Sequence, residues 1–105
     1  DCGACTVVLG ELRGERVVYR AINACIRLLA TVDGCEVVTV ESLRGPDGAL
    51  HPVQQAMVEC HGSQCGFCTP GFAMSLWSEY EHHNACASRP TRQQLARDRD
   101  GRGAR

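Results

Sequence analysis

The sequence contains no lysine, few aromatic residues and no long apolar run. All 11 basic residues are arginine, and aromatic residues make up only 5% of the 105 positions. Burial alone would therefore leave a domain of this size marginally stable. No apolar stretch approaches the roughly 18 residues of a membrane-spanning helix, and no signal-peptide pattern opens the chain. We expect a cytoplasmic chain with no membrane partner.

The chain also lacks a strong charge of either sign. Its formal net charge is −1, which argues against a general nucleic-acid binder. The balance is uneven, because residues 87–105 hold six of the arginines and only two acidic residues. The segment 97–105 has no aliphatic residue larger than alanine, so it has no face to bury. We expect it to be a solvated, atypical arginine-rich tail.

The first half of the chain predicts a small sheet. Short β-branched runs at 6–9, 17–22 and 36–41 predict three strands. The polar stretch 10–16, with its two glycines, is predicted to be a hairpin loop between the first two. Turn residues then cluster at 44–48 and indicate a boundary.

The second half predicts helices. Pro52 suits the first position of a helix, and Thr69-Pro70 repeats the signal. The apolar residues that follow Pro52 at helical spacing are Val53, Ala56, Met57 and Cys60. The predicted buried stripe of the second helix is Ala73, Leu76, Trp77 and Tyr80. Thr91, with Gln94 three residues on, has the pattern of a capping box and predicts a third helix start.

Cysteine is the residue that the chain has in excess, with eight in 105 positions. Two C-x2-C pairs stand out, Cys2-Gly-Ala-Cys5 and Cys65-Gly-Phe-Cys68, and Cys25 lies 20 residues after Cys5. Such a pair lets two sulfurs converge on one metal centre, and the small residues inside it let backbone amides approach the sulfurs. Two such pairs favour a metal site.

Four kinds of cysteine chemistry compete. Structural zinc favours two pairs about 12–20 residues apart, whereas 59 residues lie between Cys5 and Cys65. A thioredoxin-like dithiol needs a strand before the pair, and a helical pattern precedes Cys65 instead. Disulfides need an oxidising compartment, which nothing here indicates. The plant-type iron–sulfur spacing contains the C-x2-C…C portion found at Cys2, Cys5 and Cys25.

The remaining cysteines and the histidines have weaker claims to a functional role. Cys60 lies on the apolar stripe of its helix, so we expect a buried, structural thiol. Cys35 and Cys86 have no partner at ligand spacing and are predicted to be bystanders. The four histidines are not spaced as a metal motif, and we expect structural or solvated roles for all of them: His51, His61, His82 and His83.

Four segments together resemble the iron–sulfur region of the molybdenum hydroxylases. They are Asp1-Cys-Gly-Ala-Cys-Thr-Val-Val-Leu9, Ile22-Asn-Ala-Cys25, Leu50-His-Pro-Val-Gln54 and His61-Gly-Ser-Gln-Cys-Gly-Phe-Cys-Thr-Pro-Gly71. The likeness covers roughly residues 1–96, and its most specific part is the block 61–71. The Gly-Ser-Gln form is closest to the xanthine dehydrogenase and aldehyde oxidase branch.

The resemblance implies an α+β chain with two domains, both truncated. Residues 1–43 would form part of a plant-ferredoxin-like β-grasp domain, and 44–51 a linker. Residues 52–96 would form an incomplete all-α domain, similar to a four-helix bundle, that binds a [2Fe–2S] cluster. The tail 97–105 lies outside the likeness.

The resemblance also implies two [2Fe–2S] clusters and an electron-transfer role. Cys2, Cys5 and Cys25 match ligands of the first cluster, and Cys65 and Cys68 match ligands of the second. Gln64 matches a glutamine that contacts the pterin of the molybdenum cofactor. The partners would be an FAD domain and a molybdenum-cofactor-binding subunit or domain, within a xanthine dehydrogenase-like oxidoreductase whose catalytic centre lies elsewhere. A zinc-stapled, non-redox interaction module and a non-functional fragment are the alternatives.

Overall fold

The computed structural model describes the backbone of residues 2–87 and the side chains of residues 2–84. The strands are β1 (Thr6–Arg13), β2 (Arg16–Asn23) and β3 (Glu36–Val38), and the α-helices are α1 (Pro52–Glu59) and α2 (Thr69–Ala87). The chain is therefore α+β, as predicted. The third helix start, at Thr91, lies outside the described residues. No helix in the described part has both the length and the apolarity to cross a membrane.

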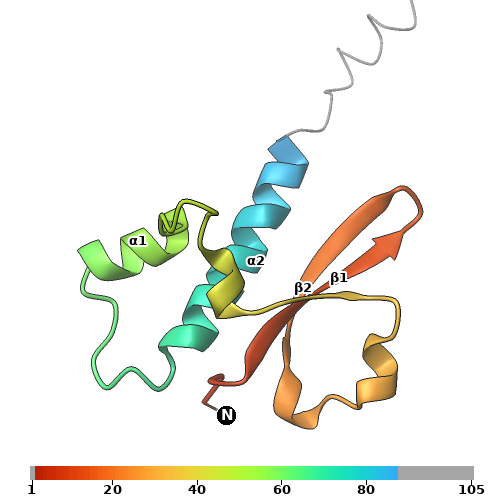
Figure 1. The fold of residues 1–105 in the computed structure, drawn as a ribbon, viewed down its shortest axis with the longest axis horizontal. Helices are drawn as coiled ribbons and strands as arrows, with labels where there is room; N and C mark the ends of the chain where they lie inside the picture. Colours follow the sequence, from red (N-terminus) through yellow and green to blue (C-terminus); the bar gives the residue numbers. More distant parts are fainter. Residues whose placement is uncertain (1, 88–105) are drawn as a thin grey trace, which may run out of the picture.

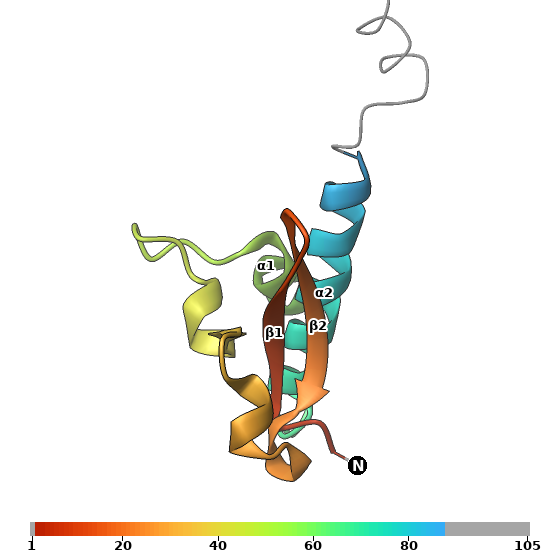
Figure 2. The same ribbon diagram turned by 90° about the vertical axis from the view of Figure 1, so that its right-hand side faces the viewer.

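The three strands form one antiparallel sheet with β1 in its centre, in the order β2-β1-β3. Helix α2 runs between the β1–β2 hairpin and α1, and it packs along the hairpin (Figures 1 and 2). The loop before β1 lies beside the N-terminal end of α2 in both views. Three short 3-10 turns connect the strands and lead toward α1: Ala24–Ile26, Leu29–Val32 and Val40–Leu43.

One apolar core joins the sheet to α2. Its buried members are Val8, Val38, Leu43 and Met74. Tyr19 and Trp77 pack against this core, with their ring centroids 5.2 Å apart in an edge-to-face arrangement. The hydroxyl of Ser78 also donates to the backbone carbonyl of Tyr19, at 3.5 Å. These contacts hold α2 against the sheet.

The start of α1 is fixed by a residue that the sequence analysis assigned only a structural role. Pro52 occupies the first helical position, as predicted, and His51 is the N-cap. The Nδ1 of His51 accepts from the amide of Val53 at 3.2 Å, and Gln54 Oε1 accepts from the amide of His51 at 3.2 Å. The ring of His51 also packs edge-on against Tyr80, with centroids 5.0 Å apart, which ties α1 to α2.

Two strand predictions were wrong in extent. The expected loop 10–16 is only a two-residue turn at Gly14 and Glu15, and β1 continues through Gly10. Gly10 is buried because the side chains of Tyr19 and Val17 occupy the space where its own would stand. The third strand ends at Val38, since Val40–Leu43 turns to place Leu43 in the core.

Two burial predictions were also wrong. The face of α2 that meets the sheet contains Ala73, fully buried Met74 and half-buried Trp77, whereas Leu76 and Tyr80 are 46% and 39% exposed. The sheet therefore covers the face of α2 that contains Met74 and not the face that contains Leu76. Cys60 is exposed because it follows the last turn of α1 as its C-cap.

Candidate functional site

The first cysteine pair lies in a tight turn directly before β1. Gly3 has a φ of 73°, a left-handed conformation that glycine adopts without strain. The carbonyl oxygen of Gly3 accepts from the Thr6 amide at 2.9 Å and from Thr6 Oγ1 at 2.6 Å. Thr6 itself is buried, with 9% of its surface exposed. These two bonds fix the turn that carries Cys2 and Cys5.

Strand pairing brings Cys25 to Cys5. Thr6 and Asn23 are the last paired residues of the β1–β2 ladder. Cys5, before Thr6, and Ala24, after Asn23, therefore lie opposite each other at the end of the ladder. The amide of Ala24 donates to the carbonyl of Cys5 at 3.1 Å, and Cys25 follows in the 3-10 turn. The two thiols are close enough for each to shift the pKa of the other.

This contact separates the two thiols in acidity. The backbone amide of Cys25, and then its thiol, hold the pKa of Cys5 below its ordinary value. The hydrogen bond to Cys5, together with burial, raises the pKa of Cys25. Thiolate is the form that binds metal, so Cys5 is the first of the pair to reach the ligand state as pH rises.

The second cysteine pair lies on the irregular segment between α1 and α2. Every residue from 60 to 68 is exposed. Gly66 has a φ of 86°, and its carbonyl accepts from the amide of Thr69 at 3.3 Å where α2 begins. The hydroxyls of Ser63 and Thr69 lie 2.6 Å apart and close the segment across its base. Cys65 and Cys68 are thus held by one local turn, and Gln64 is exposed beside them.

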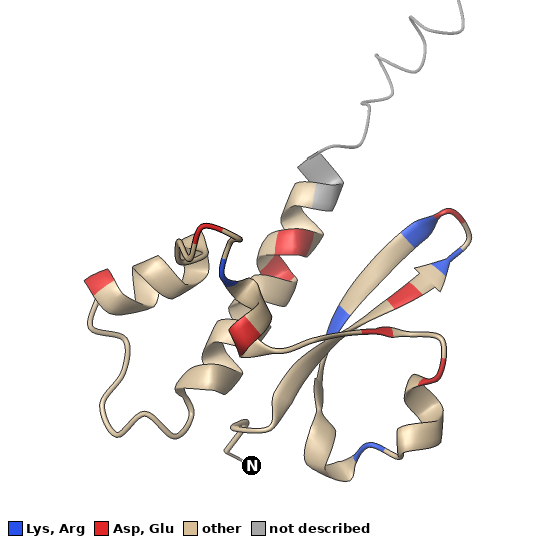
Figure 3. Cartoon of the chain, viewed as in Figure 1, with Lys and Arg blue, Asp and Glu red and all other residues tan. Residues whose placement is uncertain are grey.

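One cysteine of each pair lies at the same end of the molecule. Cys2 and Cys68 both line a cavity of about 360 Å³, together with residues that include Thr6, Asn23 and Phe72. This end carries few charges, since residues 2–10, 21–26 and 60–78 contain no lysine, arginine, aspartate or glutamate (Figure 3). The net charge of the residues around the cavity therefore favours the binding of neither a cation nor an anion.

The structure brings some of the predicted ligands together and leaves others apart. Cys25 is brought next to Cys5 by the bond from the Ala24 amide to the Cys5 carbonyl, and Cys2 shares a cavity with Cys68. Among the described residues, no three of the cysteine, histidine and carboxylate side chains converge as a metal site. The donors nevertheless suit iron–sulfur chemistry, because all five are exposed or half-buried free thiols.

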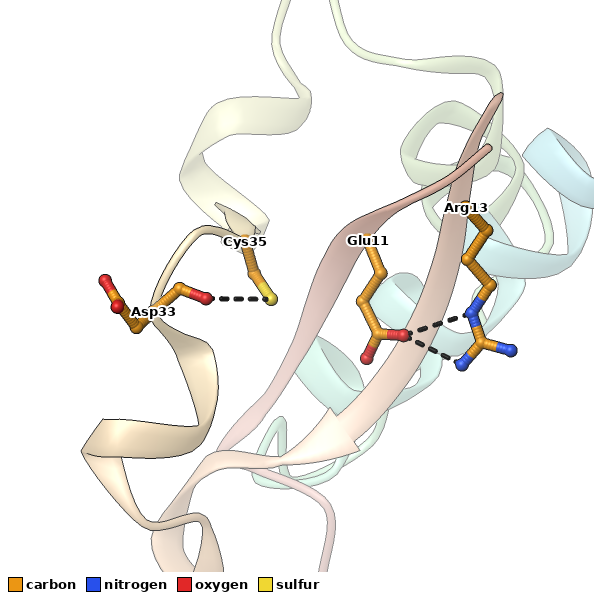
Figure 4. Close-up of polar contacts among 4 residues, drawn as sticks. All are labelled: Glu11, Arg13, Asp33 and Cys35. Carbon is orange, nitrogen blue, oxygen red and sulfur yellow. Dashed lines mark hydrogen bonds and ion pairs between the residues drawn. The ribbon is translucent and has the colours of Figure 1, made fainter. Parts of the chain in front are cut away.

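The other cysteines lie elsewhere. Cys35 directly precedes β3, and its thiol lies 3.9 Å from the carbonyl oxygen of Asp33 (Figure 4). In the same view Arg13 contacts Glu11 at 2.9 Å, which holds the pKa of the Glu11 carboxyl below its ordinary value. Cys60 borders a groove of about 510 Å³ between α1 and α2. Residue 86 is in the last turn of α2, and its side chain is outside the described ones.

Two residues that shape this end of the molecule were missed by the sequence analysis. Thr6 ties the first turn, and a hydroxyl residue three positions after Gly3 was the available signal, since such side chains bond nearby carbonyls. Gly71 packs directly against the backbone of Gly3. A glycine in the first turn of a helix, where alanine would be more stable, was the signal for that close approach.

Comparison with known proteins gives the family context. The sequence profile of the [2Fe-2S] binding domain matches residues 39–102. Xanthine dehydrogenase of Drosophila pseudoobscura pseudoobscura and xanthine dehydrogenase 1 of Arabidopsis thaliana are each 47% identical over 79 residues, which is 73% of this chain. Aldehyde oxidase of Homo sapiens is 39% identical over 84 residues, or 78% of the chain. The chain spans about 6% of the length of each of these relatives.

Proposed function

The chain belongs to the [2Fe-2S] binding domain family, and from this premise we propose that it is the electron-transfer portion of a xanthine dehydrogenase-like molybdenum hydroxylase. Cys2, Cys5 and Cys25 would hold one cluster, and Cys65 and Cys68 would hold a second. The observation that carries the proposal is that Cys2 of the first pair and Cys68 of the second pair line the same cavity.

When bound, a [2Fe–2S] cluster supplies one-electron oxidation and reduction. The residues of this chain would set the conditions for it. Gly3 and Gly66 turn the backbone in left-handed conformations, which would let amides approach sulfur atoms at the cluster. Such a relay needs no acid, base or nucleophile from the chain. The scarcity of charged residues at this end supports the same role. With few charges nearby, neither the oxidised nor the reduced state of a cluster would be strongly favoured by its surroundings.

The division of the chain is part of the proposal. Residues 1–43 would belong to a ferredoxin-like β-grasp domain, 44–51 to a linker, and 52–96 to a bundle-like helical domain. The three-stranded sheet and the two helices of the described residues support this division in outline. The shared core adds that the two parts would be docked rather than independent.

The similarity to xanthine dehydrogenases and aldehyde oxidases supports a proposal about the partners. We propose that electrons come from a molybdenum cofactor in a neighbouring domain or subunit and pass to FAD in another. Gln64 would contact the pterin of the molybdenum cofactor, and its exposed position next to Cys65 supports that role. The substrate would be a purine or another compound hydroxylated at the molybdenum centre.

Anaerobic reconstitution tests the proposal. The chain is incubated with ferrous iron, sulfide and a small-molecule thiol, and iron, acid-labile sulfide, visible absorption and electron paramagnetic resonance are measured. We expect sulfide-dependent iron binding and two distinguishable signals after reduction. Zinc binding without acid-labile sulfide would instead identify a zinc-stapled interaction module. A folded chain that takes up neither would identify a non-functional fragment.

Serine variants assign the signals. Cys25→Ser should remove the first signal alone, and Cys65→Ser the second alone. Cys35→Ser is the matched control, since Cys35 bonds only to the local backbone carbonyl of Asp33 and should leave both signals in place. Loss of either signal in the control, or retention of both in Cys25→Ser, would contradict the ligand assignment.

A further inference from the structure

The two cysteine regions approach each other through a contact of backbone with backbone, between Gly3 and Gly71. A Cβ atom at Gly71 would overlap the carbonyl oxygen of Gly3 and would lie 2.8 Å from its carbonyl carbon and 3.2 Å from its Cα. Real Cβ atoms essentially never come within 3.0 Å of another heavy atom. Gly71 is buried in this contact. No other residue type would leave the two backbones at this separation.

Backbone conformation does not explain the glycine at position 71. It lies in the first turn of α2, and its φ is not in the left-handed region. Glycine at a helical position is less stable than alanine, because it loses more conformational freedom on folding. The close approach to Gly3 therefore accounts for its presence.

Both glycines are directly linked to cysteines. Gly3 lies inside the first pair, next to Cys2, and its carbonyl is fixed by the two bonds from Thr6. Gly71 lies one helical turn after Cys68, whose carbonyl accepts from the amide of Phe72 at 3.0 Å. The cavity beside the contact is lined by Cys2 and Cys68. A change in the Gly3–Gly71 separation would move these two cysteines apart.

We propose that the Gly3–Gly71 contact sets the distance between the two cluster sites, which makes Gly71 a positioning residue for electron transfer between them. This inference rests on the proposed function. Electron transfer slows steeply as the separation of two centres grows, so a small shift here would act directly on the relay.

The rest of the interface makes the effect local. The core around Met74 and the contact of Tyr19 with Trp77 hold α2 on the sheet further along the helix. A methyl group at position 71 would therefore tilt the start of α2 away from the first turn, while the remote contacts persist. The chain should still bind its clusters after such a tilt, but the distance between the two cluster sites should change.

Gly71→Ala in the reconstituted chain tests this positioning role. The magnetic interaction between the two reduced clusters is measured as splitting or enhanced relaxation in electron paramagnetic resonance. We expect the interaction to weaken or disappear in Gly71→Ala, with iron and sulfide content unchanged. Gly62→Ala is the matched control, because its added methyl meets mainly the flexible end of Met57. An interaction as strong in Gly71→Ala as in the unmodified chain would overturn the proposal.

A second measurement needs neither clusters nor a variant. The cluster-free chain is treated with a short bis-maleimide, and cross-linked peptides are identified by mass spectrometry. We expect Cys2–Cys68 to be the main link between the two cysteine pairs. Absence of that link, when both cysteines react with a single maleimide, would overturn the proposed contact even if Gly71→Ala fails to fold. Failure to bind any cluster would count against the proposed function alone.

Discussion

The two cysteine regions are built in different ways. The first is assembled by long-range structure, because β1–β2 pairing brings Cys25 to Cys5 and a buried Thr6 fixes the turn before β1. The second rests on a local turn in an exposed segment, closed by the pair Ser63 and Thr69. The fold therefore specifies the first region strongly and the second weakly.

This difference has a consequence for cofactor binding. In the first region the strand pairing already holds Cys25 beside Cys5, so less conformational freedom remains to be lost when a metal group binds. In the second region Cys65 and Cys68 are exposed on an irregular segment. We therefore expect the second region to gain more order on binding than the first.

Met74→Ala should have the largest effect and should remove the difference between the regions. Met74 is fully buried between α2 and the sheet, so its truncation leaves a cavity in the only core of the described residues. The expected loss is about 2–5 kcal/mol of unfolding free energy. Urea unfolding followed by Trp77 fluorescence measures it. Hydrogen exchange should then show both regions opening together; protection lost in α2 alone would contradict a shared core.

Thr6→Val and Ser63→Ala form a pair that separates the two regions. Thr6→Val keeps the β-branched shape but removes a partly buried hydrogen bond, and the expected loss of unfolding free energy is about 1 kcal/mol. Ser63→Ala removes a hydrogen bond in an exposed segment, so the loss should be smaller, below about 0.5 kcal/mol.

Thiol alkylation provides the regional readout for this pair. Thr6→Val should speed the alkylation of Cys2 and leave Cys65 unchanged, because only the first turn is loosened. Ser63→Ala should speed Cys65 alone. Equal acceleration of both cysteines in either variant would show that the two turns are coupled, contrary to the comparison.

His51→Ala should affect α1 and spare both cysteine regions. The side chain of His51 caps the helix and packs on Tyr80. Loss of an N-cap costs about 0.5–2 kcal/mol. The expected result is faster hydrogen exchange in Pro52–Glu59 with the alkylation rate of Cys5 unchanged. Gln55→Ala on the same helix is the control, since its hydrogen bond to Glu59 is exposed.

Local signals in the sequence located most of the elements. The β-branched runs marked the strands, and Pro52 and Thr69-Pro70 marked the helix starts because proline suits the first turn. Gly10 was misread because glycine usually interrupts strands. Here the side chains of Tyr19 and Val17 cover it, which is a tertiary effect that local sequence does not reveal.

The candidate site was predictable in residue type but not in arrangement. The C-x2-C spacing identifies both cysteine pairs, whereas the contact of Cys5 with Cys25 depends on the strand register. In α2 two faces have helical periodicity, and only the position of the sheet decides that Met74 rather than Leu76 is buried. The approach of Gly71 to Gly3 likewise depends on how the helix docks.

Tyr19→Phe should have the smallest effect, and it probes the interface away from the cysteines. The phenol donates to Glu36 Oε2 at 3.0 Å, and this hydrogen bond, together with burial and the charges of Glu36 and Glu81, raises the pKa of Tyr19 above 10.0. The neutral phenol is thus favoured by folding. Its stabilisation is full below pH 10 and is lost as pH rises through the raised value.

At pH 7 the loss of unfolding free energy in Tyr19→Phe should be no larger than in Ser63→Ala, at most about 0.5 kcal/mol, because the hydrogen bond is solvent-exposed. Above pH 10 the difference in unfolding free energy between the two proteins should shrink. The unfolded phenol of the unmodified chain then ionises more readily than the folded one, whereas the variant has no phenol to ionise. Urea unfolding from pH 7 to 11 measures this. The unfolding free energy of the variant is subtracted from that of the unmodified chain at each pH, so that the contribution of cysteine ionisation cancels. A gap that stays constant with pH would show that Glu36 does not bias the ionisation of Tyr19. A closing gap with unchanged Cys2 alkylation would place the pH-sensitive contact in the sheet–helix interface, outside both cysteine regions.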